Sequence, residues 1–445
     1  MSWGHRHDQG GTVIEHECPV IFQTHSPGHH FFGYYDKSPI DARGERLLSQ
    51  AANFDYKRMP RADDVIDIGY WNLQTGDYTR LAETRAYNWQ QGSQLQWLGP
   101  DFDRKIIFND RNESGLVSRI VDTLDGDERV LPFPVYSVSP NGQFAICANY
   151  PRLAFAHPGY HYEGPVDACW DGPLPEGDGL FRLDLESGNV AQILSTRAMT
   201  EFLPLPSMLG SIHYLEHAML DAAGKRFHFL HRWQLPDGGI YSRLLAANAD
   251  GSDIRCLSDT GYVSHCCWSQ PGEVVGWGRP ASGTAGLRRS RFLSRYIIRP
   301  LLPLYHTIMR RIPTARAALL GDTYLAFPDR EGAAQLPATP LTAQKFPDDG
   351  HCTFRPGDSR WMLTDTYDDP DSYRHLFLYD REQDELIRIG RFYSEPETNA
   401  KGYRADLHPR WDFSGTRVII DSTHERGERQ MYVIDVSEIV GAGNS

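Results

Sequence analysis

The chain has 445 residues, of which 40% are hydrophobic, 12% aromatic and 23% charged, and its formal net charge at pH 7 is -13. This composition is that of a globular protein, and the high aromatic share favours strands over long helices. The acidic balance argues against a nucleic-acid partner, because phosphate binding needs a basic face. The length permits either two or three ordinary domains or one large all-β architecture that closes on itself.

The first eleven residues are polar and contain no apolar run. We therefore expect neither a secretory signal nor a membrane anchor there, and the default location is the cytoplasm. No Cys-x-x-Cys spacing occurs, which predicts reduced and mostly buried thiols rather than disulfides or a zinc knuckle. The seven cysteines are Cys18, Cys147, Cys169, Cys256, Cys266, Cys267 and Cys352.

One pattern recurs seven times along the chain. An inner hairpin such as "GHHFFGYYDKSPIDARGERLLSQA", from residue 28, is followed by an outer hairpin such as "VIDIGYWNLQTGDYTRLAE", from residue 65. The later inner hairpins begin near residues 87, 135, 211, 261, 349 and 404. Two hairpins make one four-stranded unit, and a closed ring of such units is a β-propeller.

The sequence therefore predicts one all-β domain over 1–445, a seven-bladed β-propeller. The last outer hairpin, "QMYVIDVSEIV", is cut short by the C-terminus. We expect "TVIEHECPVIFQ", residues 12–23, to supply the missing strand, so that pairing of the two chain ends closes the ring.

Two units carry extra length. Residues 151–178 form a loop rich in proline and aromatic residues, and residues 284–322 predict a basic helical insertion broken at Pro300, Pro303 and Pro313. The stretch 288–320 contains eight arginines and no acidic residue. This pattern favours peripheral contact with an anionic membrane surface, or a lid over the acidic propeller body; the alternative is a solvated hairpin.

Polar rings recur where the inner strands begin. In a propeller these strands line the central channel, so their first residues are predicted to lie at its mouth. The residues at this position are His29, His30, Trp89, Gln90, Tyr136, His213, His265, His351 and His408. The ends of the second strands face the same mouth, at Asn109, Arg111, Tyr150, Arg152, His231, Arg232, Asp365 and His424. The alternative is that these side chains only bond neighbouring blades.

Three segments carry a resemblance. "FHFLHRW", "SHCCW" and "DLHPRW…VIIDSTH" resemble the oligogalacturonate lyase family of seven-bladed propeller polysaccharide lyases, over roughly the C-terminal half of the chain. In that family one His and an Arg serve β-elimination, while three His and a Gln hold a divalent metal. The resemblance implies that His231 matches the catalytic histidine and that His265 and His408 match two metal ligands.

The chain departs from the family pattern at two positions. Arg410 stands where the final ligand histidine is expected, and Ala405 stands at the glutamine position. Either His351 or His424 could complete the ligand set, since imidazole is the commonest ligand for such ions. Alternatively, Arg410 could take the place of the cation.

The expected reaction is β-elimination at a uronic acid. A base near neutral pKa removes the proton next to the carboxyl group, a cation neutralises that group, and a tyrosine protonates the leaving oxygen. The residues predicted for catalysis are His231 as the base, Arg410 or Arg232 as the neutralising cation, and Tyr136. The metal ligands, for Mn, Zn or Ca, are His265, His351 and His408. The predicted substrate contacts are His29, His30, Tyr35, Trp89, Arg152 and His213, with Tyr136 on the same rim.

Other functions are also open. Paired carboxylates for glycoside hydrolysis are available at Asp36, Asp365 and Asp406, but the rim is richer in histidine. A serine peptidase is disfavoured because no Gly-x-Ser-x-Gly elbow occurs. The main alternative is a non-catalytic propeller that binds a glycan or a partner protein, associated with polysaccharide synthesis at the membrane.

Overall fold

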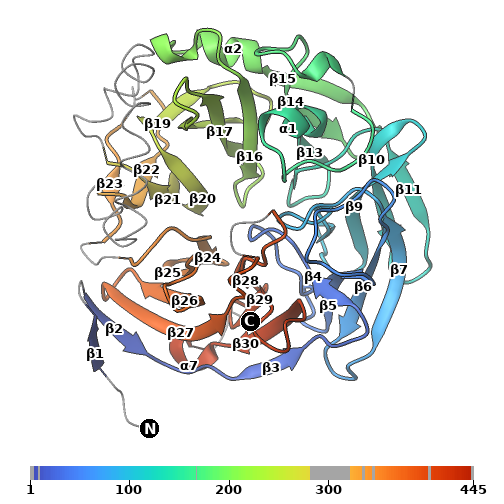
Figure 1. Ribbon diagram of the computed structural model, residues 1–445, viewed down its shortest axis with the longest axis vertical. Coiled ribbons are helices and arrows are strands. Elements are labelled where there is room, and N and C mark those ends of the chain that lie inside the picture. The colour runs from blue at the N-terminus through green and yellow to red at the C-terminus, as the bar shows by residue number, and fades with distance from the viewer. Residues whose placement is uncertain are drawn as a thin grey trace.

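The structure is a computed structural model that describes residues 5–8, 11–166, 168–280, 321–332, 336–342, 346–398 and 402–441. Its strands form seven sheets arranged as a ring around a central channel (Figure 1). The predicted seven-bladed β-propeller is confirmed. Apart from residues 321 and 322, the described residues do not include the predicted basic insertion at 284–322, so its helices and its membrane contact stay predictions.

The first four blades follow one another along the chain, each with its innermost strand first. Blade one contains β4 (His29–Phe31), β5 (Arg46–Ala52), β6 (Ile66–Asn72) and β7 (Tyr78–Thr84). Blade two contains β8 (Gln96–Trp97), β9 (Lys105–Asn112), β10 (Gly115–Asp122) and β11 (Glu128–Leu131). Blade three contains β12 (Ser137–Val138), β13 (Phe144–Ala148), β14 (Gly179–Asp184) and β15 (Val190–Ser195). Blade four contains β16 (His213–Leu220), β17 (Arg226–Gln234), β18 (Ile240–Asn248) and β19 (Arg255–Gly261).

The remaining three blades repeat this order. Blade five contains β20 (Val263–Gln270), β21 (Glu273–Gly278), β22 (Thr323–Pro328) and β23 (Thr339–Pro340). Blade six contains β24 (Thr353–Arg355), β25 (Asp358–Asp365), β26 (Tyr373–Asp380) and β27 (Glu385–Tyr393). Blade seven contains β28 (Arg410–Trp411), β29 (Arg417–Ser422) and β30 (Gln430–Asp435) from the C-terminal end, with β3 (Val20–Gln23) as its outermost strand.

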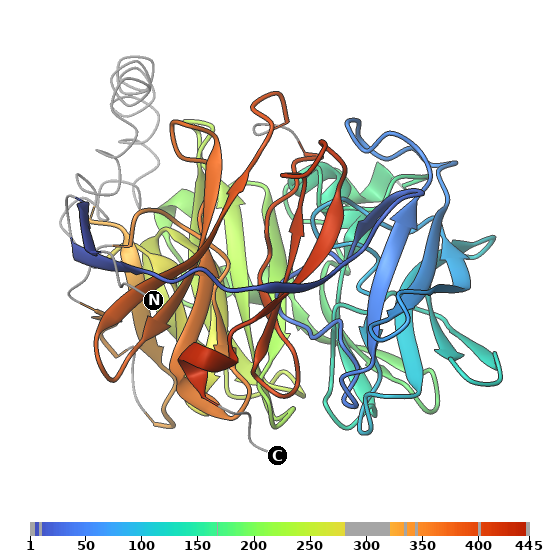
Figure 2. The same cartoon turned by 90° about the horizontal axis from the view of Figure 1, so that it is seen from below.

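The N-terminal segment closes the ring. Strand β3 pairs antiparallel with β30, with Val20 opposite Ile434 and Gln23 opposite Tyr432, as predicted from the sequence. The segment continues beyond this blade, because β2 (Gly11–Glu15) pairs in parallel with β27 of blade six and β1 (His5–Asp8) pairs with β2. Figure 2 shows the N-terminal segment running across the outside of both blades. The predicted strand 12–23 is thus two strands that join two blades.

Apolar side chains from neighbouring blades pack against each other to form the core. One cluster combines Leu48 of blade one, Phe108 of blade two and Val433 of blade seven, all with no exposed surface. Burial of such a side chain contributes about 1.5–3 kcal/mol. Strands that are buried on both faces, such as β5 and β13, therefore supply the packing between blades.

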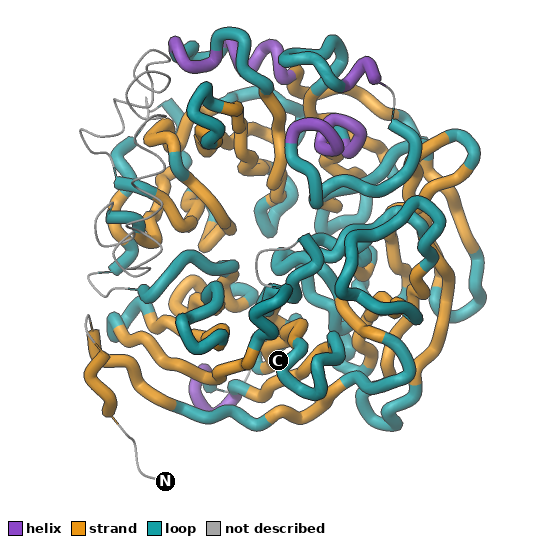
Figure 3. Tube along the Cα trace, in the orientation of Figure 1, coloured by secondary structure: helices purple, strands orange, loops and turns teal. Residues whose placement is uncertain are grey.

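The residues that the structure describes form few helices (Figure 3). They are α1 (Tyr150–Ala156), η1 (Ala168–Trp170), α2 (Thr196–Glu201), η2 (Pro206–Met208) and α7 (Ser437–Val440). Helix α1 begins the 151–178 insertion, where Asn149 caps it by accepting a hydrogen bond from the backbone of Arg152. No helix among the described residues is long and apolar enough to span a membrane. None of the seven cysteines, all of which lie in the described part of the chain, forms a disulfide.

The segment after β4 leaves its blade and enters the channel. The Tyr35 hydroxyl donates to the carbonyl of Cys266 in blade five at 3.0 Å, and the guanidinium of Arg410 in blade seven donates to the carbonyls of Gly33 and Tyr34. Gly33 has φ +116, and a Cβ there would lie 2.6 Å from the backbone of Gln91, so only glycine fits. Residues 33–35, called the channel segment below, therefore contact the innermost strands of blades five and seven.

Candidate metal centre in the central channel

Two inner segments bring three potential metal ligands together. His351 precedes β24, while Asp406 and His408 precede β28, and their ligand atoms lie within 4.8 Å of one another. His265 of β20 lies outside this set of three but next to it, with its ring centroid 4.1 Å from that of His351, and the four residues are called the cluster below. All four side chains are buried. His265, His351 and His408, the three predicted ligands, thus lie side by side.

A carboxylate faces the Nδ1 atom of two of these histidines. Asp365 lies 2.9 Å from Nδ1 of His351, and Asp349 lies 3.2 Å from Nδ1 of His265. Metal-ligating histidines commonly donate their second N–H to such a carboxylate, which fixes the tautomer that leaves Nε2 with a lone pair. The second nitrogens therefore have the environment that a ligand requires.

Electrostatics keep the ligands in their binding forms. Burial, followed by the nearby His351, lowers the pKa of both His265 and His408, so these imidazoles are neutral at pH 7. Nδ1 of His408 is buried with no hydrogen-bond partner in the described part of the chain.

Asp406 is the anionic member of the cluster. Burial raises the pKa of this carboxyl, but Arg404 and Arg374 outweigh burial and bring the pKa well below its usual value. The two guanidinium groups lie 2.9 and 2.7 Å from the carboxylate. Asp406 is therefore ionised throughout the physiological range.

A fourth histidine enters the channel from blade four. The register of β16 against β17 shifts between Glu216 and Met219, and within this bulge His217 adopts φ 55°. His408 is also left-handed, at φ 43°. Left-handed backbone is uncommon outside glycine and gathers at functional sites, where surrounding structure holds it. The His217 ring centroid lies 6.5 Å from that of His265.

Glu216 anchors a charged group beside His217. Burial raises the pKa of Glu216, but His157 and Arg232 together bring it well below the usual value. Nδ1 of His157 lies 2.7 Å from the carboxylate, and Arg232 donates to it. Burial lowers the pKa of His217 to about 4, although Glu216 acts to raise it from 3.4 Å away.

Aromatic rings surround the cluster. The Tyr35 centroid lies 5.2 Å from that of His351, and the Tyr367 centroid lies 6.1 Å from it. Tyr160, from the 151–178 insertion, stacks on His157 at 4.4 Å and lies 6.1 Å from His217. Tyr160 and Tyr367 are half-buried, whereas the four residues of the cluster are buried.

His231, predicted as the base, lies within blade four. Arg243 donates to its Nδ1 at 3.1 Å, and its Nε2 lies 3.0 Å from Nδ1 of His213. His213 in turn contacts the carbonyl of Met208 through its own Nε2 at 2.8 Å. Because both of its ring nitrogens are used in these hydrogen bonds, His231 has no free lone pair. Its side chain also has no exposed surface. Its geometry does not suit a base.

The predicted arginines have different surroundings. Arg232 lies beside Glu216, next to the cluster. Arg410 is fully buried and pairs with Asp421 at 2.9 Å as well as with the channel segment. Arg152 donates to backbone carbonyls, including that of His213 at 2.7 Å. Arg410 and Arg152 therefore hold backbone in place.

The remaining predicted substrate contacts, except Tyr35, are not brought into the cluster. His30 contacts Ser49 at 2.8 Å within blade one, and Trp89 donates to the carbonyl of Arg58 at 2.8 Å. His29 packs against Tyr56, with centroids 4.9 Å apart. Tyr136 accepts a hydrogen bond from Gln91 at 2.8 Å. Their roles in substrate binding stay predictions.

Sequence reasoning missed several residues that the structure places in or around the cluster. These are Asp406 as a candidate ligand, His217, Glu216, Arg404, Arg374, Tyr160 and Tyr367. Asp406 could have been found from the sequence, because it stands only two residues before the predicted ligand His408. The family pattern instead places the glutamine ligand at Ala405, which has no ligand atom in its side chain. His217 is hidden because the bulge in β16, rather than strand alternation, directs it to the channel.

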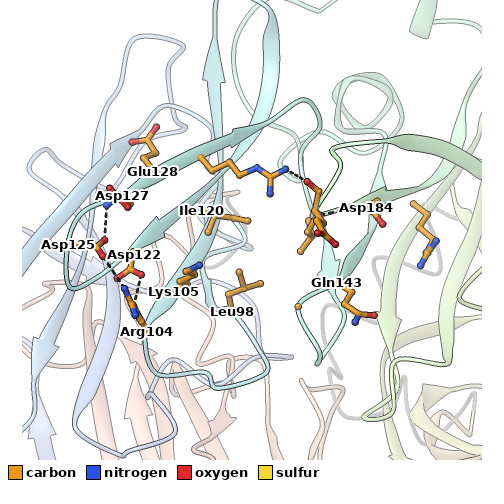
Figure 4. A pocket seen from close by; sticks show the side chains of 15 residues that line it. Leu98, Arg104, Lys105, Ile120, Asp122, Asp125, Asp127, Glu128, Gln143 and Asp184 are labelled. Atoms are coloured by element: carbon orange, nitrogen blue, oxygen red, sulfur yellow. Dashed lines mark hydrogen bonds and ion pairs between the residues drawn. The ribbon is translucent and has the colours of Figure 1, made fainter.

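A groove on the outside of the ring lies away from the cluster. It has a volume of about 690 Å³ and lies between the outer parts of blades two and three (Figure 4). In its lining, Arg104 pairs with Asp122 at 2.6 Å and with Asp125 at 3.0 Å. The groove thus offers no convergent set of reactive groups.

Comparisons with known proteins support the fold. No family model and no curated protein matches this chain. An oligogalacturonate lyase from Vibrio parahaemolyticus aligns over 98% of this chain and 97% of its own, with a TM-score of 0.59 and 14% identity. An oligogalacturonate lyase in complex with manganese aligns over 98% of this chain and 96% of its own, with a TM-score of 0.57 and 15% identity. At these identities the likeness shows the seven-bladed propeller fold alone.

Proposed function

We propose that this protein is a metal-dependent lyase that cleaves a uronate-containing oligosaccharide by β-elimination. The observation that carries the proposal is the buried set of His351, Asp406 and His408, whose ligand atoms lie within 4.8 Å of one another, with His265 beside His351. A carboxylate lies on Nδ1 of both His351 and His265. Such a cluster is costly to bury unless it binds a metal or moves protons. The fold shared with oligogalacturonate lyases is consistent with this chemistry.

The donor set indicates the kind of metal. Three imidazoles and one carboxylate suit Mn or Zn, whereas Ca prefers an all-oxygen shell. Bound there, a divalent cation would neutralise the substrate carboxylate and so acidify the proton next to it. Neutral imidazoles and the ionised Asp406 are ready to hold it without losing protons.

His217 is the proposed base. Burial lowers its pKa to about 4, so the imidazole is neutral at pH 7 with a lone pair available, and Glu216 acts to raise this pKa toward the near-neutral value that suits a base. Nδ1 is the nitrogen nearest Glu216, so Nε2 would accept the proton from the carbon next to the carboxyl group. The carboxylate of Glu216 would stabilise the resulting imidazolium.

Tyr160 is the proposed acid. Burial raises its pKa, so the phenol keeps its proton at neutral pH. As the proton leaves the ring carbon, its electron pair forms the new double bond, the bond to the 4-linked oxygen breaks, and the Tyr160 hydroxyl protonates that oxygen. Arg404, half-buried above Asp406, would orient the substrate carboxylate with the N–H groups that it does not use on Asp406.

The test is formation of the unsaturated product from oligogalacturonate, followed by its ultraviolet absorbance, with protein loaded with Mn or Zn. The same oligosaccharide after reduction of its carboxyl groups is the control substrate, and His424→Ala in blade seven is the control variant. We expect His217→Asn to lower kcat by at least about 100-fold, the usual contribution of a general base. A protein that binds the oligosaccharide but forms no product under any metal condition would instead be a binding module.

A further inference from the structure

A second hollow of the central channel lies beyond Tyr35. Its volume is about 320 Å³, and residues on or beside the innermost strands of all seven described blades line it. His265 precedes Trp268 on β20, and His351 precedes Phe354 on β24, so the inner strands pass the metal cluster first. Because inner strands run in one direction along a propeller axis, this hollow is at the opposite mouth of the channel.

Polar groups with unused hydrogen-bonding capacity face the hollow. The ammonium of Lys37 contacts the two carboxylate oxygens of Asp36 at 2.6 and 2.8 Å. An ammonium has three protons, and no third partner is found among the described residues. The Thr353 hydroxyl, also in the lining, is buried with no partner in the described part of the chain. The hollow therefore offers a carboxylate, an ammonium and a hydroxyl.

Aromatic rings also line the hollow. The indole N–H of Trp268 donates to the carbonyl of Met219 at 2.9 Å, which fixes this ring at the wall. The guanidinium of Arg381 covers Phe354 from 5.6 Å. At the rim, Phe413 is 37% exposed and packs against Phe102 with centroids 4.9 Å apart. Preset rings beside a few polar groups are typical of a small-molecule site.

We propose that this hollow binds one neutral hexose unit of a saccharide. Its volume falls in the range of ligand pockets, and the C–H face of a pyranose packs on aromatic rings. Adjacent hydroxyls of the sugar would donate to the Asp36 carboxylate and accept from the Lys37 ammonium. The described lining contains two acidic residues, Asp36 and Asp221, and one basic residue, Lys37. The net negative charge disfavours a uronate, which is itself an anion. The proposal does not rest on the metal centre.

The test titrates the full-length protein with D-glucose, D-galactose and N-acetyl-D-glucosamine, with D-galacturonate as the acidic comparator. Trp268 and Trp97 line the hollow, so tryptophan fluorescence reports binding, and calorimetry gives Kd. Thr353→Val keeps the side-chain shape and removes one unpartnered hydroxyl, so we expect Kd to rise about 5- to 10-fold without loss of folding. Lys37→Met should weaken binding further.

Two controls separate this site from the metal centre. Thr339→Val, on the exposed strand β23, and His408→Ala should both leave Kd for the neutral sugar unchanged. The proposal is overturned if every neutral sugar has a Kd above about 100 mM, because such a value corresponds to negligible affinity. Tighter binding of D-galacturonate than of every neutral sugar would also overturn it, as would a Kd unaffected by both Thr353→Val and Lys37→Met.

Discussion

Individual histidines in this protein differ because of what surrounds each ring. His351 and His265 have a carboxylate on Nδ1, whereas His231 has an arginine donating to Nδ1 and His213 on Nε2. The first arrangement leaves a lone pair for a metal, and the second uses both nitrogens within the blade. Sequence alone cannot separate these cases, since each histidine belongs to a similar strand.

Removal of one ligand should abolish metal binding. His408→Ala deletes one of three groups whose ligand atoms lie within 4.8 Å of one another. The remaining side chains then provide too few ligands to hold the metal. We expect elemental analysis after dialysis to give about one Mn or Zn per wild-type chain and less than about 0.1 per variant chain.

The matched control is His424→Ala, which removes a half-buried histidine bonded to Ser422 in the same blade. Equal metal content in the two variants would show that His408 does not hold the ion.

Replacement of His228 by an apolar residue should stabilise the protein. His228 has no exposed surface, and neither ring nitrogen has a hydrogen-bond partner among the described residues. Because two polar atoms are buried without partners, His228→Leu should raise the free energy of unfolding at pH 7 by about 1–3 kcal/mol. Denaturant unfolding measures this. His30→Leu, which loses a bond to Ser49, should instead lower it.

The pH dependence of stability follows from the same burial. Burial lowers the pKa of His228 to about 3, below the value of 6.5 expected in the unfolded chain. The unfolded state therefore binds more protons, so the contribution of this residue is complete above pH 6.5 and is lost as pH falls toward 3. We expect Tm of His228→Leu to decline less than that of the wild type between pH 7 and 4. Parallel curves would contradict this account.

At the scale of elements, turns and alternation predicted the blades, because each hairpin carries its own local signal. Closure of the ring by residues 12–23 was also predictable, since the last unit lacked a strand. The division of these residues into two strands, β2 and β3, that pair with different blades was not predictable. Pro19 and Cys18 interrupt the segment, and the parallel pairing of β2 with β27 depends on the neighbouring blade. Bulges such as that at Glu216 and Met219 likewise depend on packing, so His217 could not be placed from the strand pattern.

Two truncations test the closure. Removal of residues 1–16 deletes β1 and β2 but keeps β3, whereas removal of residues 1–23 also deletes the antiparallel pairing with β30. The longer truncation exposes an edge of blade seven and opens the ring, so we expect a distinctly larger fall in Tm. Thermal unfolding by circular dichroism would show it. Equal Tm values would mean that β3 does not close the ring.

Arg410 connects blade seven to the channel segment. It pairs with the fully buried Asp421 and donates to the carbonyls of Gly33 and Tyr34. Arg410→Met leaves the carboxylate and two carbonyls without this partner, so we expect a loss of about 3–5 kcal/mol in the free energy of unfolding. The double variant Arg410→Met with Asp421→Leu should recover part of that loss. A single variant as stable as the wild type would contradict the structural role.

On the scale of the whole molecule, ring closure brings together residues that are far apart in sequence. His265, His351 and His408 come from three successive blades, and the channel segment contributes Tyr35 from a fourth. The repeat predicted which strands face the axis, so these histidines could be chosen in advance. The depth at which each side chain meets the axis depends on bulges and on Tyr35, which is why the surrounding charges were not anticipated.

Anomalous diffraction from crystals grown with Mn tests the central claim most directly. The account predicts one strong peak at the manganese edge, bounded by His265, His351, Asp406 and His408, that disappears in His408→Ala crystals. A channel without a peak, or a peak held by other residues while this cluster stays empty, would contradict it.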